Sequence, residues 1–306
     1  MRRIFAVGLL ATLALTACGG QDATEPGSGS SESAAGSTDR SFDVSGIKKV
    51  DDIAALLPQA VADKGRLTIG ASIDYAPAEF RADDLKTAIG YDVDLGKALG
   101  KVLGLEAEVV DGEFASLLPG IGSKYDIGIS SFTITPERTK NYNMVSYITV
   151  GSSYAVKTGN PEGFDPDDVC GKSIAVQTGT YQDEELAGFS EQCTTDGKEK
   201  IDILQYSRQS DATTNVVGNK AVAFYADSTV ASYAAALTNG QMEVVGGIRD
   251  AAPQGIVIKQ DDAAMTEAVQ KAMQQLMDDG TWGEILDAWG IEGDAALKTA
   301  ELNPEG

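Results

Sequence analysis

The hydrophobic pattern of the first half of the chain alternates between short β-rich runs and longer segments with helical spacing. Strands are predicted at 66–73, 106–110 and 126–131, with helical segments at 90–105 and 114–125 between them. In the segment 90–105, Val93, Leu99 and Val102 recur at near-helical spacing, and Gly104 closes the pattern. This strand–helix order favours a parallel sheet covered by helices.

The second half repeats the same alternation. Strands are predicted at 172–177, 201–206, 221–225, 242–246 and 255–259. A turn that runs into a helix is predicted at 178–189, and helices at 210–220, 227–237 and 262–279. In the last helix, apolar residues that include Met265, Val269 and Leu276 form one stripe. Such a stripe is typical of a helix that faces a core, which we favour over a binding surface.

The first residues indicate export. Arg2 and Arg3 precede an apolar run at 4–15 that is too short to span a bilayer with ease, so residues 1–17 are interpreted as a signal peptide. LTAC at 15–18 resembles the lipobox of bacterial lipoproteins, which implies cleavage before Cys18 and lipidation of its thiol; the alternative is ordinary cleavage beside a chance cysteine. Gly and Ser dominate the next segment, so we expect 18–45 to be a flexible lipid-anchored tether.

Charge and composition narrow the function. The formal net charge of -22 argues against nucleic acid and anionic membrane surfaces as partners. The chain contains no histidine, which excludes imidazole bases, Ser-His-Asp triads and His-ligated metals. If Cys18 carries lipid, Cys170 and Cys193 remain, and a lone cysteine pair in an exported protein predicts a disulfide, with two free thiols as the alternative.

Several motifs together resemble one known family. They are GRLTIGASIDYAPAEF, GYDVDLGKALG, DIGISSFTITPER, VQTGTYQDEEL and DGTWGEILDAWG, and they extend over about residues 65–291. Their order and spacing resemble the polar amino acid-binding proteins of bacterial ABC importers, which are solute-binding proteins of family 3. The resemblance implies an α/β type II periplasmic binding fold, with two lobes, two crossing hinge strands and a cleft between the lobes. We therefore expect lobe 1 at 46–151, lobe 2 at 152–247, and the rest of lobe 1 with a C-terminal tail at 248–306.

A run of hydroxyl residues ahead of an arginine is the clearest candidate for ligand binding. Ser130, Ser131 and Thr133 follow a predicted strand and precede Arg138. A free amino acid carries a carboxylate, and the planar guanidinium of arginine can donate two parallel hydrogen bonds to it. We therefore assign Arg138 to the ligand carboxylate; the alternative is a surface arginine paired with Glu137 or a more distant acid.

The resemblance also suggests roles for the hydroxyl residues. Thr133 would aid Arg138 in holding the carboxylate, and Ser131 would accept a hydrogen bond from the ligand's ammonium group. Ser130 belongs to the same corner, where ligands of open α/β sheets bind at the carboxyl ends of strands. Thr135 precedes Pro136, so we interpret it as the cap of a helix and not as a binding residue.

Lobe 2 is expected to supply the opposite charge. Asp227 follows a predicted strand at a helix start, and by resemblance its carboxylate would take the α-ammonium group, although it could also cap the helix. Thr178, Thr180 and Tyr181 belong to a second element of lobe 2, where amides at a helix start attract a carboxylate. A simple strand-to-helix turn is the alternative interpretation of that element.

The ligand's side chain is predicted to lie between two aromatic rings. Tyr75 and Phe114 occupy the matching positions by resemblance, although a core role for either ring is the alternative. Relatives that bind cationic amino acids often have an aspartate at the position of Ser72. The absence of that aspartate here argues against lysine, arginine or histidine as the ligand. Asp74 and Glu79 could still reach a cation, and a cationic ligand therefore stays open.

We expect an extracytoplasmic substrate-binding lipoprotein of an ABC transporter, lipid-anchored to the outer face of the cell membrane through Cys18. Its partners would be a free amino acid and a membrane permease, and we expect it to be a monomer that does not bind nucleic acid. We expect no catalytic residues, no cofactor and no metal site. Closure of the two lobes, not chemistry, would be its mechanism. The alternatives are an exported dehydratase of arogenate or prephenate type, a ligand-sensing lipoprotein not linked to transport, and a purely structural surface lipoprotein.

Overall fold

The structure, a computed structural model, describes residues 39–305. The expected signal peptide at 1–17, the expected lipidation site Cys18 and most of the 18–45 tether lie outside these described residues. In the described part of the chain, three short helices precede the first strand: η1 (Val44–Gly46), α1 (Asp51–Ala54) and α2 (Gln59–Lys64). The first described element thus begins close to where the folded part of the chain is expected from composition.

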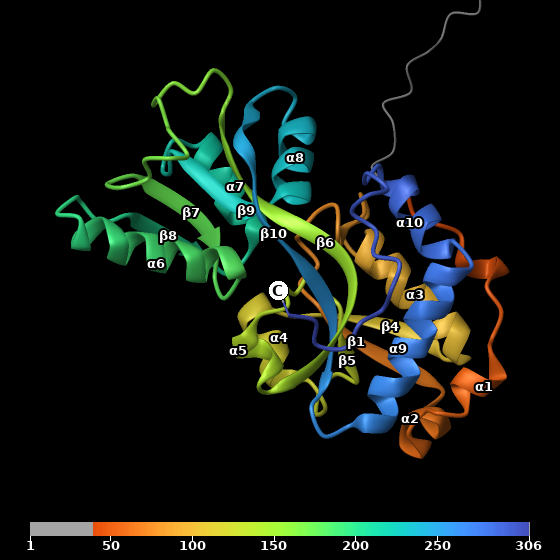
Figure 1. Ribbon diagram of the computed structural model, residues 1–306. Helices are drawn as coiled ribbons and strands as arrows, with labels where there is room; N and C mark the ends of the chain where they lie inside the picture. The colour runs from red at the N-terminus through yellow and green to blue at the C-terminus, as the bar shows by residue number, and fades with distance from the viewer. Residues whose placement is uncertain (1–38, 306) are drawn as a thin grey trace, which may run out of the picture. The chain divides into compact units, whose positions relative to one another are not determined.

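One mixed sheet runs through this part of the chain, with its strands in the order β4-β1-β5-β10-β6-β9-β7-β8 (Figure 1). The strands are β1 (Arg66–Ala71), β4 (Glu106–Asp111), β5 (Ile127–Gly128), β6 (Tyr142–Lys157), β7 (Ser173–Gln177), β8 (Asp202–Tyr206), β9 (Ala223–Asp227) and β10 (Met242–Lys259). β1 is parallel to β4 and β5, and β7 is parallel to β8 and β9, whereas β6 and β10 are antiparallel to each other. A small second sheet pairs β2 (Phe80–Arg81) with β3 (Ala88–Ile89).

The two long strands β6 and β10 connect two groups of strands, which we call lobe 1 (β1, β4 and β5) and lobe 2 (β7, β8 and β9). The register of β10 on β6 shifts between Val245 and Arg249 and again between Arg249 and Ala252, where the strands pass from one lobe to the other. The hydrophobic pattern does not predict β6, because most of this strand is buried on both faces and shows no alternation. The lobe boundaries at 46–151, 152–247 and 248–306 stay a prediction.

The core of lobe 1 lies between its strands and three packed helices, α3 (Tyr91–Leu103), α9 (Ala263–Asp278) and α10 (Thr281–Trp289). The apolar stripe of α9, including Met265, Val269 and Leu276, is buried, which confirms its predicted core-facing role. Gly90 begins α3 with a φ of 130°, and a Cβ atom there would lie 2.1 Å from the carbonyl oxygen of Ala78. Glycine is therefore required where α3 packs against the loop after β1.

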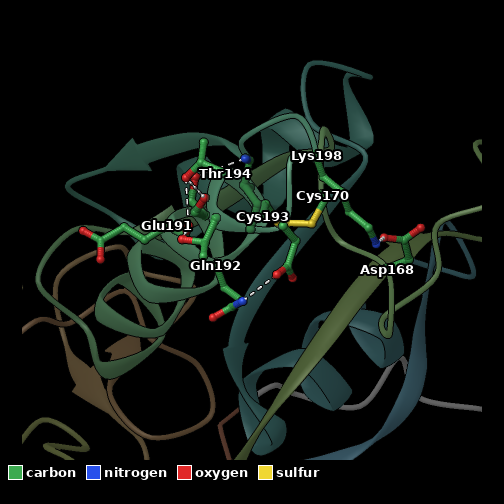
Figure 2. Close-up of a disulfide and its surroundings, with 11 residues drawn as sticks. Asp168, Cys170, Glu191, Gln192, Cys193, Thr194 and Lys198 are labelled. Carbon is green, nitrogen blue, oxygen red and sulfur yellow. Dashed lines mark hydrogen bonds and ion pairs between the residues drawn. A yellow bond between two sulfur atoms is a disulfide. The ribbon is translucent and has the colours of Figure 1, made fainter.

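Lobe 2 carries α6 (Tyr181–Thr195), α7 (Gln209–Val217) and α8 (Ser228–Leu237) around its three strands. Figure 2 shows the disulfide between Cys170, in the loop before β7, and Cys193, near the end of α6, with their Cα atoms 5.6 Å apart. The predicted disulfide is therefore confirmed. It closes a loop over a sequence separation of 23 residues, for which the chain-entropy estimate of the stabilisation is about 3 kcal/mol.

Candidate ligand-binding site

A small cavity lies between the two lobes. Its lining residues are Tyr75, Phe114, Ser131, Thr133, Arg138, Thr180, Tyr181, Gln182 and Asp227. Eight of the ten residues predicted to bind ligand are among them; Ser130 and Thr178 are not. Segments that are far apart in the sequence thus bring their polar and aromatic side chains to one place.

Arg138 is a buried cation at this cavity. It lies in the short helix α5 (Pro136–Thr139), and the side chain of Thr135 accepts from its backbone N–H, which confirms the predicted cap. The guanidinium donates to the carbonyl oxygen of Thr133 at 2.8 Å and, across the two lobes, to that of Gly179 at 3.1 Å. Within residues 39–305 it forms no ion pair, so a carboxylate partner is not supplied by the described chain.

The electrostatic state of Arg138 follows from its burial. Its side chain is 6% exposed, and burial lowers the pKa of the guanidinium, while the carboxylates of Glu184 and Asp227 oppose that effect. Arginine has five N–H donors and remains charged in proteins. A ligand carboxylate at this position would provide the charge that a buried guanidinium requires.

Asp227, at the end of β9, presents the opposite charge from lobe 2. It is 3% exposed, and its carboxylate accepts from the side-chain amides of Gln182 at 2.8 Å and Gln254 at 2.7 Å. Burial raises its pKa to about 6, against the opposing effect of these amides and of Arg138. Asp227 makes no side-chain capping bond to α8, so the capping role considered from the sequence is absent and the carboxylate serves the cavity wall.

Ser131 is fixed in an unusual conformation by Asp92, a residue at the start of α3. Its φ is 50°, its backbone N–H donates to the Asp92 carboxylate at 2.7 Å, and its hydroxyl lies 3.2 Å from the same oxygen. Tyr147 also donates to that oxygen, at 3.0 Å. Burial raises the pKa of Asp92 to about 7, although these hydrogen bonds oppose the shift. The strand β5, at Ile127–Gly128, is shorter than the predicted strand at 126–131.

Two predicted binding residues make internal contacts instead of lining the cavity. The Ser130 hydroxyl donates to Glu79 and accepts from the backbone N–H of Ser72 at 3.0 Å. Thr178 donates to the carbonyl oxygen of Tyr206 through both its backbone N–H and its hydroxyl, at 2.8 and 3.2 Å. Both side chains therefore support the residues beside the cavity, and their direct contact with a ligand stays a prediction.

The aromatic residues line the cavity from lobe 1. The backbone N–H of Asp227 donates to the Tyr75 hydroxyl at 3.1 Å, so this ring also connects the two lobes. Phe114 begins α4 (Phe114–Gly120) and stacks on Phe132 with centroids 4.9 Å apart. The Arg138 guanidinium carbon lies 6.0 Å from the centre of the Phe114 ring. The predicted placement of a ligand side chain between Tyr75 and Phe114 is not tested by these contacts.

The predicted binding set lacks two residues of this site. Gln182 lines the cavity from the first turn of α6, and Gln254 reaches Asp227 from the long strand β10. Gln182 follows Tyr181 in the TGTYQ motif, so its place on the same helix start is the signal that could have identified it. From the sequence, Gln254 is a possible lining residue without a decisive argument, because its role depends on a contact between residues 27 positions apart.

Comparison with known proteins decides the family. Residues 67–292 match the bacterial extracellular solute-binding proteins, family 3. The chain belongs to this family. The resemblance drawn from the five motifs is therefore confirmed, and the matched range agrees with the 65–291 span of those motifs.

Similar proteins cover most of this family 3 chain. The arginine-binding protein ArgT of Corynebacterium glutamicum is 35% identical over 258 residues, 84% of each chain, and the L-cystine-binding protein TcyJ of Escherichia coli is 27% identical over 233 residues, 75% of this chain and 84% of TcyJ. Among solved structures, a mutant of ArgBP from T. maritima has a TM-score of 0.69 and 28% identity, covering 76% of this chain and 97% of that one. The expected type II periplasmic binding fold is thereby confirmed.

Another similar structure is the ancestral amino acid-binding protein AncCDT-1, described as a precursor of cyclohexadienyl dehydratase. It has a TM-score of 0.66 and 30% identity, and the match covers 77% of this chain and 99% of that one. In the family 3 chain, no cluster of metal-ligating side chains occurs among residues 39–305. The same residues include no helix with the length and apolar character needed to cross a membrane.

Proposed function

We propose that this family 3 protein is an extracytoplasmic substrate-binding protein of an ABC importer that captures a polar amino acid between its lobes. The observation that carries the proposal is that Arg138 of lobe 1 and Asp227 of lobe 2 line one cavity with opposite charges. The α-carboxylate of the ligand takes the guanidinium, and its α-ammonium group takes the Asp227 carboxylate. One zwitterion thereby neutralises a buried charge on each lobe.

Lobe closure follows from this division of charges. An amino acid that bridges Arg138 and Asp227 makes both contacts only when the lobes are together, and only such differential contacts shift an equilibrium between open and closed states. The bond from Arg138 to the Gly179 carbonyl, and the bond between Asp227 and Tyr75, already connect the lobes beside the cavity. The ligand would add its own bridge to these contacts, and β6 and β10 would carry the hinge motion.

The relatives support an amino acid as the ligand. ArgT is named an arginine-binding protein and TcyJ an L-cystine-binding protein, and both cover most of this chain. We further propose that residues 1–17 are a signal peptide, that Cys18 carries lipid, and that the loaded protein delivers its ligand to a membrane permease. A role in sensing is the alternative use of the same binding event, and permease and ATPase genes beside this gene would distinguish transport from sensing.

One observation is relevant to the dehydratase alternative: the chain is similar to AncCDT-1, which is described as a precursor of cyclohexadienyl dehydratase. The carboxyl groups considered as its general acid are Asp74 and Glu79, and neither lines the cavity. Glu79 is fully buried, and its carboxyl group accepts a hydrogen bond from Ser130. We therefore propose binding without chemistry. Incubation with arogenate or prephenate tests this point, because formation of an aromatic product would contradict it.

A thermal-shift screen of the twenty amino acids with citrulline and ornithine tests the proposed function. A ligand that binds the folded state raises its stability by RT ln(1 + [L]/Kd), so at least one amino acid should raise the melting temperature. The Arg138→Ala variant is the matched control. Without ligand it should melt close to the wild type, but an amino acid should no longer raise its melting temperature. The absence of a shift with every amino acid in the wild-type protein would contradict the proposal.

A further inference from the structure

Two buried carboxyl groups lie behind the serines of the ligand cavity, and we call them the buried carboxyl pair: Glu79, directly before β2, and Asp92, in the first turn of α3. Glu79 is fully buried and Asp92 is 1% exposed. They hold adjacent residues, because the Ser130 hydroxyl donates to Glu79 and the backbone N–H of Ser131 donates to Asp92. Within residues 39–305, neither carboxyl group forms an ion pair. A buried carboxylate without a cation is costly, so the pair must reduce its charge in another way.

The hydrogen bonds of the buried carboxyl pair leave one oxygen of each group free. Three donors converge on Oδ2 of Asp92: the backbone N–H and hydroxyl of Ser131, at 2.7 and 3.2 Å, and the hydroxyl of Tyr147, at 3.0 Å. Ser130 donates to Oε1 of Glu79. In the described part of the chain, Oδ1 of Asp92 and Oε2 of Glu79 have no hydrogen-bond partner. A single proton between these two oxygens would satisfy both.

The surroundings of the buried carboxyl pair decide which group keeps a proton. Asp92 accepts three hydrogen bonds in the first turn of a helix, and both features favour its negative charge. Burial, followed by the charge of Asp92, raises the pKa of Glu79 well above its ordinary value, and a hydrogen bond between the two carboxyl groups raises it further. The same hydrogen bond opposes the larger effect of burial on the pKa of Asp92. These effects place the proton on Glu79 and the charge on Asp92.

The titratable groups around the buried carboxyl pair come from the loop after β1, from α3 and from β6. They are Asp74 and Tyr75 in the loop, Tyr91 on α3 and Tyr147 on β6. Aspartate and tyrosine side chains are neutral or negative, so these neighbours do not compensate a second negative charge. Two carboxyl groups that share a site cannot both ionise readily, and their protons belong to the pair.

We propose that Glu79 and Asp92 share one proton, which Glu79 holds and donates to Asp92, and that this proton positions Ser131 to accept the ligand's ammonium group. The role toward the ligand rests on the proposed function. Ser131 lines the cavity, and its hydroxyl donates to the Asp92 carboxylate, so the lone pairs of that oxygen remain free to accept from an ammonium group. The charge of Asp92 thus acts on the ligand through Ser131 and adds to that of Asp227. Glu79 and Asp92 are positioning residues, because neither lines the cavity.

Infrared spectroscopy of the ligand-free, full-length protein tests the proton directly. At about pH 8, Asp227 and Asp92, whose pKa values are about 6 and about 7, are mostly ionised, so the C=O band of a protonated carboxyl group should come from Glu79. Glu79→Gln should remove this band, whereas Glu106→Gln, at an exposed position of β4, should retain it. The absence of the band from the wild type, or its full intensity in Glu79→Gln, would overturn the inference and leave the proposed function intact.

The pH dependence of stability gives a second measurement on the same variant. The pKa of Glu79 is higher in the folded protein than in the unfolded chain, so its proton favours folding at acid pH. This contribution is lost as the pH rises through the raised pKa, which the infrared band locates. Glu79→Gln donates an amide N–H in place of the acid proton, so its melting temperature should fall less than that of the wild type over this range. Parallel melting profiles would overturn the inference.

Calorimetry at about pH 8 compares Glu79→Gln with Asp92→Asn, because each variant replaces a carboxyl group with an amide of the same size. The ligands are L-arginine, L-cystine and any other amino acid that raises the melting temperature in the screen. Glu79→Gln replaces a neutral group and should raise Kd about two- to threefold, whereas Asp92→Asn removes the charge behind Ser131 and should raise Kd at least about tenfold. Equal losses in the two variants would show a structural role and overturn the inference.

The outcomes for the buried carboxyl pair and for the proposed function can be told apart. If Asp92→Asn does not fold, Glu79→Gln carries the test alone, and a loss of affinity of about tenfold or more in that variant would overturn the inference. Failure of every amino acid to bind the wild type would overturn the proposed function and the role of the pair toward the ligand. The infrared band of the ligand-free protein would still decide whether the proton is shared.

Discussion

Arg208 donates two parallel hydrogen bonds to Asp111, at 2.9 and 3.0 Å, and thereby joins the start of α7 in lobe 2 to the end of β4 in lobe 1. Arg81 donates to the same carboxylate at 2.7 Å. Burial would raise the pKa of Asp111, but the hydrogen bonds and charge of Arg208, with Arg81, hold it below its ordinary value. The two lobes are thus connected by an ion pair that does not line the ligand cavity.

Loss of this ion pair should weaken ligand binding without abolishing it. The side chains of Arg208 and Asp111 are 30% and 25% exposed, so solvent screens their interaction. We therefore expect the pair to contribute about 0.5–1 kcal/mol to lobe closure, and its loss should raise Kd about two- to fivefold. A double-mutant cycle with Arg208→Gln and Asp111→Asn, measured by calorimetry, isolates that contribution. Lys198→Ala is the control, since its pair with Asp168 lies within lobe 2. A coupling energy of zero would refute the interlobe role.

Removal of Arg138 should abolish amino acid binding. A buried charge that loses its partner costs about 3–5 kcal/mol, so Arg138→Ala should raise Kd at least about a hundredfold. The ligand-free variant should melt close to the wild type, because the loss of two hydrogen bonds to the carbonyl groups of Thr133 and Gly179 is offset by the removal of a buried charge. Calorimetry and thermal melting measure the two effects, with Arg66→Ala as an exposed control. Affinity retained by Arg138→Ala would contradict the assignment.

Much of the fold could be predicted because its signals are local. The stripe of α9 and the spacing of α3 follow from helical periodicity, and Gly90 and Gly104 mark the limits of α3. The strand β6 escaped prediction because burial on both of its faces removes the alternation on which a strand prediction depends. The helix α10 lies in the motif DGTWGEILDAWG, which contributes to the family resemblance.

The candidate site could be predicted where one short segment carries several functional groups. Ser131, Thr133 and Arg138 lie within eight residues of one another, and a family motif covers them. Asp92 and Gln254 act through contacts with residues 39 and 27 positions away, which no local pattern records. Polar residues on buried faces, such as Asp92 in the first turn of α3, are the one signal that could have suggested such supporting contacts.

The disulfide should stabilise lobe 2 without contributing to ligand affinity. Cys170→Ser combined with Cys193→Ser should lower the free energy of unfolding by about 3 kcal/mol, because the unfolded chain regains the entropy of the open loop. Neither cysteine lines the cavity, so Kd should be unchanged. Thermal melting with and without reductant measures the effect, and the double variant, which should not respond to reductant, is the control. A reductant-insensitive wild-type protein would contradict the prediction.

Acid should weaken ligand binding through Asp227. Its pKa is raised by burial from 3.8 to about 6, so the folded ligand-free protein binds a proton more readily than the unfolded chain. This group therefore favours the folded state below pH 4, and that contribution is lost as the pH rises through about 6. An ammonium ligand requires the ionised carboxylate, so Kd should increase by up to about tenfold for each pH unit below 6.

The Asp227→Asn variant separates this effect from the titration of other groups. The variant should bind amino acids weakly at neutral pH, because the ligand's buried ammonium group loses its counter-charge. The affinity that remains should not show the wild-type decrease between pH 6 and 4. Asp92, whose pKa is about 7, remains in both proteins and cancels in the comparison. Calorimetry across this pH range measures both. Parallel pH profiles for wild type and variant would show that Asp227 is not the group that meets the ligand's ammonium.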